Sequence, residues 1–152
     1  VGLRVGEGSN MRDRRRQTPL DLLSRIPLFR GCTKDELRHI DRAATQADYA
    51  AGQLMCREGD VGRELIMIVE GEAAIDRGGV EIATVGPGAF IGEMSLLDGG
   101  PRSATVTSTS EVKALVLPTR EFWQVIDEVP AIAHRLLATL AERLRAADEA
   151  AF

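Results

Sequence analysis

The sequence contains few of the side chains that build metal centres and covalent cross-links. Only two cysteines, Cys32 and Cys56, and two histidines, His39 and His134, occur among its 152 residues. The cysteines form no Cys-x-x-Cys pair, so we interpret them as unpaired thiols. With no ligand cluster and no nucleophile beside a base, we predict no metal site and no catalytic residue. We therefore expect a protein that is not an enzyme.

Long apolar runs are also lacking. No stretch is long enough to cross a bilayer, and residues 1–17 have no apolar core of the kind found in signal peptides. This predicts no membrane span and a cytoplasmic location, whether the chain is a whole protein or a fragment. The composition, 44% hydrophobic and 28% charged, is typical of one folded domain with a core.

Charge is unevenly distributed along the chain. Residues 1–17 contain five arginines against Glu7 and Asp13, a net charge of +3, which leaves −7 for the rest of a chain whose total is −4. We interpret this segment as a flexible basic tail, with contact to a membrane surface or RNA as the alternative. The acidic remainder disfavours binding of nucleic acid by this chain alone. We divide the chain into a tail (1–17), a domain (18–147) and a C-terminal end (148–152).

The segment before residue 45 has patterns typical of short helices. Thr18 and Pro19 are a common helix start, and Pro27 ends that helix. Thr33 and Glu36 have the spacing of a capping box at the start of a second helix. From Tyr49 onward, glycines separate short segments of strand length: 54–57, 64–70, 72–77, 80–85, 103–107 and 112–117. Turns at this spacing predict an eight-stranded jelly-roll β-barrel that follows an N-terminal helical bundle.

Helical periodicity returns near residue 120. A helix is predicted at 120–129, and Pro130 begins a second one. Apolar residues recur every three or four positions along this second helix: Ile132, Leu136, Leu137, Leu140 and Leu144. Such a stripe most often packs against a core. The predicted fold class is therefore mostly β, with flanking helices at both ends.

Residues 90–106 gather the groups needed to bind a phosphate joined to a sugar. Gly92 and Glu93 open a run that can form one or two helical turns, whose free N–H groups would face an anion. The turn at 98–101 then returns Arg102, whose guanidinium offers paired donors to a phosphodiester. Glu93 would repel a phosphate, so we predict that it accepts a hydrogen bond from a neutral hydroxyl such as that of ribose. A structural ion pair between Glu93 and Arg102 is the alternative.

The order of these residues resembles the phosphate-binding cassette of cyclic nucleotide-binding domains, a family that includes bacterial catabolite activator proteins and the regulatory subunits of cAMP-dependent protein kinase. Its pattern is Phe-Gly-Glu, an apolar residue, a small residue and Leu, a turn, then Pro-Arg, a small residue, Ala, Thr or Ser, and Val. The resemblance implies that Glu93 binds the ribose 2′-hydroxyl and Arg102 the cyclic phosphate. It also implies contacts from the other cassette positions: Gly92, Met94, Ser95, Ser103 and Ala104. Ile91, inserted before Gly92, is the one departure inside the cassette.

The resemblance covers about residues 18–147 and implies a cyclic nucleotide sensor. We expect cAMP ahead of cGMP, because cAMP is commoner among bacterial-type relatives, and no other cofactor. In the family the terminal helix closes over the base or forms a dimer seam, so Leu140 and Leu144 are candidates for covering the base. Expected partners are the nucleotide, an effector that the sequence does not identify, and a second copy of the chain bound through this helix.

Three other functions compete with this interpretation. A cupin enzyme needs several histidines converging on a metal, whereas His39 and His134 lie on predicted helices outside the barrel. A jelly roll that binds protein partners and no nucleotide is disfavoured by the intact Glu93 and Arg102. The ligand-binding half of a transcription regulator stays open, although the chain carries no helix-turn-helix.

Overall fold

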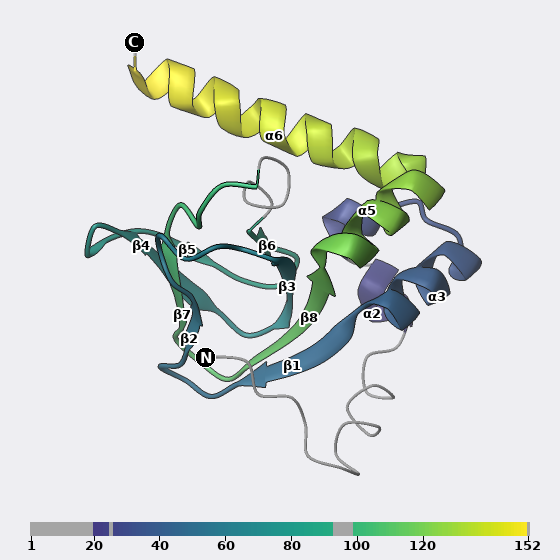
Figure 1. Cartoon of the computed structure of the whole chain (residues 1–152), viewed down its shortest axis with the longest axis horizontal. Coiled ribbons are helices and arrows are strands. Elements are labelled where there is room, and N and C mark those ends of the chain that lie inside the picture. Colours follow the sequence, from purple (N-terminus) through teal and green to yellow (C-terminus); the bar gives the residue numbers. More distant parts are fainter. Residues whose placement is uncertain (1–19, 25, 93–98, 152) are drawn as a thin grey trace.

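The computed structural model describes residues 20–24, 26–92 and 99–151, although not the side chains of residues 21, 22 and 149–151. The N-terminal part contains α2 (Leu20–Ser24), the 3-10 helix η1 (Pro27–Phe29) and α3 (Lys34–Ala43). Strands β1 to β8 follow, and the chain ends with α5 (Thr119–Glu128) and α6 (Pro130–Ala151). Figure 1 shows the helices gathered at one end of the strands, with α6 extending back over them.

The strands form two four-stranded antiparallel sheets. The first has the order β1 (Thr45–Tyr49), β8 (Val112–Pro118), β3 (Glu64–Glu70) and β6 (Phe90–Ile91). The second has the order β2 (Leu54–Cys56), β7 (Thr105–Ser108), β4 (Ala73–Arg77) and β5 (Val80–Val85). Non-consecutive strands are neighbours in both sheets, which is the arrangement of a jelly roll. The predicted fold class, an eight-stranded jelly roll with flanking helices, is confirmed.

Strand β3 is buried on both faces because it separates two clusters of apolar side chains. Leu65 and Met67 belong to a first cluster with the helices, whereas Ile66 and Ile68 belong to a second cluster inside the barrel. Successive side chains of a strand point to opposite faces, so a strand between two cores needs an unbroken apolar run. Residues 65–68 supply that run, and all of them are at most 1% exposed.

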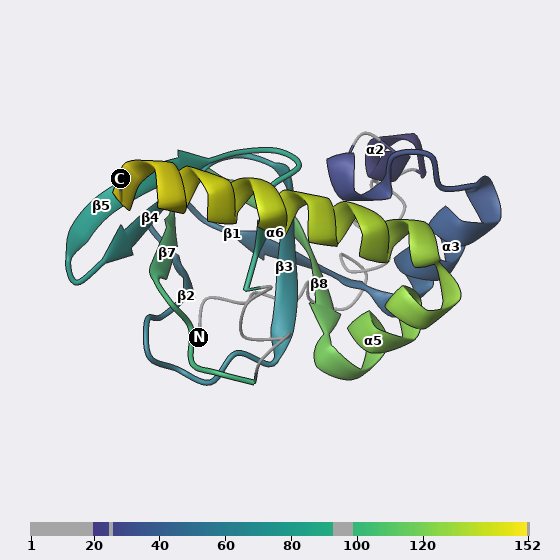
Figure 2. The same cartoon turned by 90° about the horizontal axis from the view of Figure 1, so that it is seen from above.

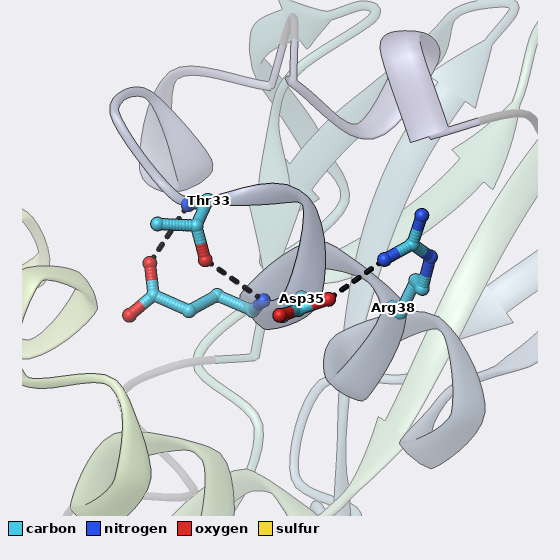
Figure 3. Close-up of polar contacts among 4 residues, drawn as sticks. Thr33, Asp35 and Arg38 are labelled. Atoms are coloured by element: carbon cyan, nitrogen blue, oxygen red, sulfur yellow. Dashed lines mark hydrogen bonds and ion pairs between the residues drawn. The ribbon is translucent and has the colours of Figure 1, made fainter.

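Helix α3 begins at the predicted capping box. The Glu36 amide donates to Thr33 Oγ1 at 3.1 Å, and the Thr33 amide donates to Glu36 Oε1 at 2.8 Å. Figure 3 shows these bonds beside the exposed pair formed by Asp35 and Arg38, whose atoms are 2.7 Å apart. The cap fixes the start of the helix, so that its apolar face packs against the first cluster.

Helix α6 packs against the N-terminal helices at its start and then extends over the barrel. Its first turns bury Ile132 and Leu136 in the first cluster, and Arg135 Nη1 donates to the Leu28 carbonyl at 3.5 Å. Figures 1 and 2 both show the helix running from α5 toward β4 and β5. It continues through residue 147 as far as Ala151. None of the described helices is both long and apolar enough to cross a membrane.

A candidate ligand-binding cavity

A cavity of about 440 Å³ lies between the second sheet, the end of β6, residues 102–104 and α6. Its volume is within the range of small-molecule sites. One wall is apolar and is formed mainly by Ile75, Ile82, Val85 and Val106, from β4, β5 and β7. The polar lining consists largely of three arginines: Arg77, Arg102 and Arg143. The cavity therefore pairs an apolar wall with positive charge.

Arg102 is the most firmly anchored of these arginines. Only 7% of it is exposed, and its Nη2 donates to the Glu64 carbonyl at 2.9 Å. Its backbone amide donates to the Asp60 carbonyl at 2.7 Å, and its carbonyl accepts from the Gly59 amide at 2.9 Å. The buried Nη1 has no hydrogen-bond partner among the described residues. A buried donor without an acceptor is costly, so this nitrogen is suited to an anion entering the cavity.

Gly92 provides the space that the Arg102 guanidinium occupies. Its φ is +94°, a conformation that side-chain-bearing residues rarely adopt. A Cβ added here would overlap Arg102 Nη1 and would lie 3.1 Å from the Glu64 carbonyl oxygen. The glycine is thus required both by its backbone conformation and by the close approach of the arginine.

The structure brings four of the predicted contact residues to the cavity. Gly92, Arg102, Ser103 and Ala104 all line it. Three others, Glu93, Met94 and Ser95, lie outside the described residues. The contribution of each residue to binding stays a prediction.

Among the described residues of α6, Arg143 is the one that lines the cavity, and sequence reasoning missed it. Its guanidinium carbon is 5.1 Å from the centroid of the Phe90 ring, and burial lowers the pKa of Arg143. Leu140 packs partly buried against the first cluster, and Leu144 is 63% exposed; neither is among the described lining residues. The apolar periodicity indicated Leu140 and Leu144 as candidates, whereas the lining residue Arg143 lies between them in the sequence. The available indication was the position of this arginine next to apolar helix positions, because a long basic side chain there can lie along the apolar surface and reach a neighbouring site.

Cys56 also lines the cavity, as a protonated thiol. Its Sγ donates to the Ala104 carbonyl at 3.6 Å. Burial raises the pKa of the thiol and outweighs the opposing effect of the nearby Arg102 charge. Both cysteines are free, and within the described part of the chain no group of three or more histidine, cysteine or acidic residues could hold a metal ion.

Comparisons with known proteins agree with this geometry. A profile of the family described as "Cyclic nucleotide-binding domain" matches residues 46–129. The chain is 36% identical over 127 residues to the cyclic AMP receptor protein of Thermus thermophilus, covering 80% of this chain and 59% of that protein. It is 37% identical over 134 residues to a cyclic nucleotide-gated potassium channel of Mesorhizobium japonicum, covering 85% of this chain and 36% of the channel.

A solved structure extends the likeness to three dimensions. The crystal structure of the Thermus thermophilus catabolite activator protein matches with a TM-score of 0.75 and 36% identity, over 80% of this chain and 60% of that one. The chain spans less than two thirds of each of these relatives, so the likeness concerns one part of each. The family is regulatory rather than catalytic, and its profile covers more than half of the chain, with most of the cavity lining. This chain belongs to the cyclic nucleotide-binding domain family.

Proposed function

We propose that this chain is the ligand-sensing domain of a regulatory protein and that the cavity binds a 3′,5′-cyclic nucleotide. The observation that carries the proposal is Arg102, a buried guanidinium whose Nη1 lacks a partner among the described residues and lies where Gly92 leaves room. The singly charged phosphodiester of a cyclic nucleotide would supply the missing acceptor. Charge-assisted bonds from a guanidinium to phosphate oxygens are among the stronger hydrogen bonds in proteins.

The rest of the ligand fits around this anchor. Glu93 accepts a hydrogen bond from the ribose 2′-hydroxyl, as the resemblance of the cassette implies, and Met94 and Ser95 contribute contacts beside it. The apolar wall formed by Ile75 and Val85 receives a face of the base. cAMP is the reference ligand because a relative that is 36% identical is named a cyclic AMP receptor protein, and cGMP is the natural comparison. No metal or further cofactor is needed for binding.

The proposed output of binding is a change in the position of α6. Pro130 cannot donate a backbone hydrogen bond, so its junction with Val129 is a natural hinge. Arg143 lines the cavity, and Arg135 on the same helix donates to the Leu28 carbonyl. One rigid helix thus contacts both the ligand site and the N-terminal helices. A ligand that contacts α6 only in its docked position would increase the population of that state.

The partner of this output is a second copy of the chain or a separate effector. Leu137 and Leu144 are 64% and 63% exposed and lie seven residues apart, on one face of α6. An exposed apolar face of this kind favours a homodimer that buries both residues. Sedimentation velocity tests this: the unchanged chain should sediment as a dimer and the Leu137→Ser/Leu144→Ser variant as a monomer. A monomeric unchanged chain would leave a separate effector as the partner.

The test of nucleotide binding is a calorimetric titration with cAMP and cGMP. Arg102→Ala should lower the affinity for either nucleotide at least tenfold, because charge-assisted hydrogen bonds contribute about 1.5–3 kcal/mol each. Arg120→Ala is the matched control, since Arg120 is an exposed arginine on α5 outside the cavity lining. Circular dichroism should show that both variants are folded. If neither nucleotide binds the unchanged chain, the protein-interaction alternative replaces this proposal.

A further inference from the structure

Arg77 is a second guanidinium at the cavity, and its position is set by a specific bond. It is the last residue of β4, where Ala73, Ile75 and Arg77 share one face of the strand. Ala73 is buried, Ile75 lines the apolar wall and Arg77 lies at the exposed rim. Arg77 Nε donates to the Ser103 carbonyl at 3.0 Å, which holds the guanidinium next to the residue that follows Arg102.

Among the described residues, no carboxylate forms an ion pair with Arg77. The Glu58 carboxylate, beside the same turn, accepts from the Gly78 amide at 2.9 Å. Arg77 lines the cavity together with the residues of the apolar wall, so its Nη groups are available to a ligand bound there. That wall is the place where the flat base of a nucleotide would lie if its phosphate is bound by Arg102.

The described lining is rich in donors and poor in acceptors. It contains three arginines and no aspartate, glutamate, asparagine or glutamine. An arginine donates two parallel hydrogen bonds to O6 and N7 of guanine. Adenine presents N7 beside an amino group, which is itself a donor, so the second N–H of the arginine would meet no acceptor. The described part of the lining thus matches guanine better than adenine.

We infer that Arg77 is a specificity-determining residue that makes the site prefer cGMP to cAMP by donating to O6 and N7 of guanine. The inference rests on the proposed cyclic-nucleotide function and reverses the base preference expected from bacterial-type relatives. It also assigns two roles to one side chain. Nε positions the Ser103 carbonyl, and the Nη groups contact the base.

The test compares three nucleotides on matched variants by calorimetry. cIMP is the useful third ligand, because hypoxanthine keeps O6 and N7 of guanine but lacks its 2-amino group. The unchanged chain should bind cGMP and cIMP at least about fivefold more tightly than cAMP, the lower end of the discrimination given by a bidentate arginine–guanine pair. Arg77→Ala should bring the ratio close to one, mainly by weakening cGMP and cIMP. Arg77→Lys keeps the charge without the planar fork and should also lose most of the preference.

The outcomes separate this inference from the function on which it rests. A preference for cGMP below about fivefold, or a preference for cAMP, overturns the role of Arg77 but leaves the cyclic-nucleotide site intact. The same follows if Arg77→Ala weakens all three nucleotides by one common factor, because the side chain then only positions Ser103. A preference for cGMP that cIMP does not share would mean that the 2-amino group is recognised, which also overturns the inference. If none of the three binds the unchanged chain, the proposed function fails with it.

Discussion

At the scale of single residues, Gly92 shapes the cavity because it has no side chain. Gly92, Arg102 and the Glu64 carbonyl meet at one point, where a Cβ on residue 92 would overlap the guanidinium. The arginine depends on the glycine for space and on Glu64 for its orientation. Substituting the glycine should therefore impair the arginine, although residue 92 has no side chain to contact a ligand.

Gly92→Ala is expected to abolish ligand binding and to destabilise the fold. The matched control is Gly52→Ala, because Gly52 has a similar φ of +81° but no atom within 4 Å of an added Cβ. The control should lose only about 1–2 kcal/mol from its left-handed backbone conformation and should still bind nucleotide. Urea unfolding and calorimetry measure the two effects. Equal losses of stability and normal binding in both variants would contradict the close approach described for Arg102.

The residues of the site differ in how far they could be predicted. Gly92 and Arg102 were predictable because a glycine, an acid, a turn and a base occur there in a fixed order along the chain. Arg77 was not, because a lone arginine on a strand is usually solvated, and the only indication for Arg143 was its place between apolar positions of the helix. Their positions depend on register and on packing of α6 over the barrel, which local patterns do not contain.

At the scale of elements, α6 is the part expected to respond to a ligand. Its first turns pack in the first cluster, whereas residues 141–148 are exposed, and Arg143 among them contacts the Phe90 ring. In hydrogen exchange, saturating cAMP or cGMP should increase protection across residues 132–145 as well as 90–106. A ligand bound between α6 and the barrel would hold the helix in its docked position.

The α6 response should require Arg143. Arg143→Ala should reduce the ligand-induced protection of α6 without removing nucleotide binding, since Arg102 still holds the phosphate. Arg145→Ala, two residues along the same helix and outside the described lining, is the control and should leave the protection unchanged. Protection confined to residues 90–106 in the unchanged chain would mean that α6 is a fixed part of the core.

The cap of α3 allows a second test at this scale. Thr33→Ala removes one of the two reciprocal bonds of the capping box and should lower the free energy of unfolding by about 1 kcal/mol. Arg38→Ala breaks only the exposed pair with Asp35, which should contribute a few tenths of a kcal/mol. Urea unfolding compares the variants. A loss for Arg38→Ala that equals the loss for Thr33→Ala would show that the cap adds nothing beyond a surface contact.

Two strands escaped prediction for physical reasons. β1 has only a short apolar alternation, Ala47 and Tyr49 around Asp48, and the polar Gln46 is also buried where the strand pairs with β8. β6 is only two residues long and exists because Phe90 and Ile91 pair with β3. Long-range pairing determines both strands, whereas β3 and β5 were visible from their own residues.

For the molecule as a whole, buried titratable groups predict how stability depends on pH. Tyr49 is 2% exposed, and burial is the main reason why its pKa lies above the ordinary value of about 10; the charge of Glu64 adds to the effect. Burial likewise raises the pKa of Cys56 and, together with the charge of Glu36, that of Cys32. The unfolded chain loses these protons at lower pH than the folded chain does. The stabilisation is therefore complete below the unfolded pKa values and is lost as the pH rises above them.

The free energy of unfolding should stay level near neutral pH and fall above about pH 9. Tyr49 contributes at most about 1.4 kcal/mol per pH unit, and the partly exposed Cys32 and Cys56 contribute less because water screens them. Urea unfolding in a reducing buffer between pH 7 and 11 measures the slope. Tyr49→Phe should show a shallower decline above pH 10, whatever its stability at neutral pH. An identical slope in the variant would show that Tyr49 is not the responsible group.

Because the core consists of two clusters, the choice of boundaries matters when this domain is expressed alone or fused to another protein. The first cluster takes side chains from α2, η1 and α3, before the profile-matched residues 46–129, and from α6 after them. A gene fragment trimmed to those residues would keep α5 but lose the other helices that cover Leu65, Met67, Leu115 and Leu117, and an apolar patch exposed in this way promotes aggregation. A fusion or biosensor built from this chain needs its junctions before Leu20 and after Arg143, because the barrel depends on its helices and Arg143 of α6 lines the cavity.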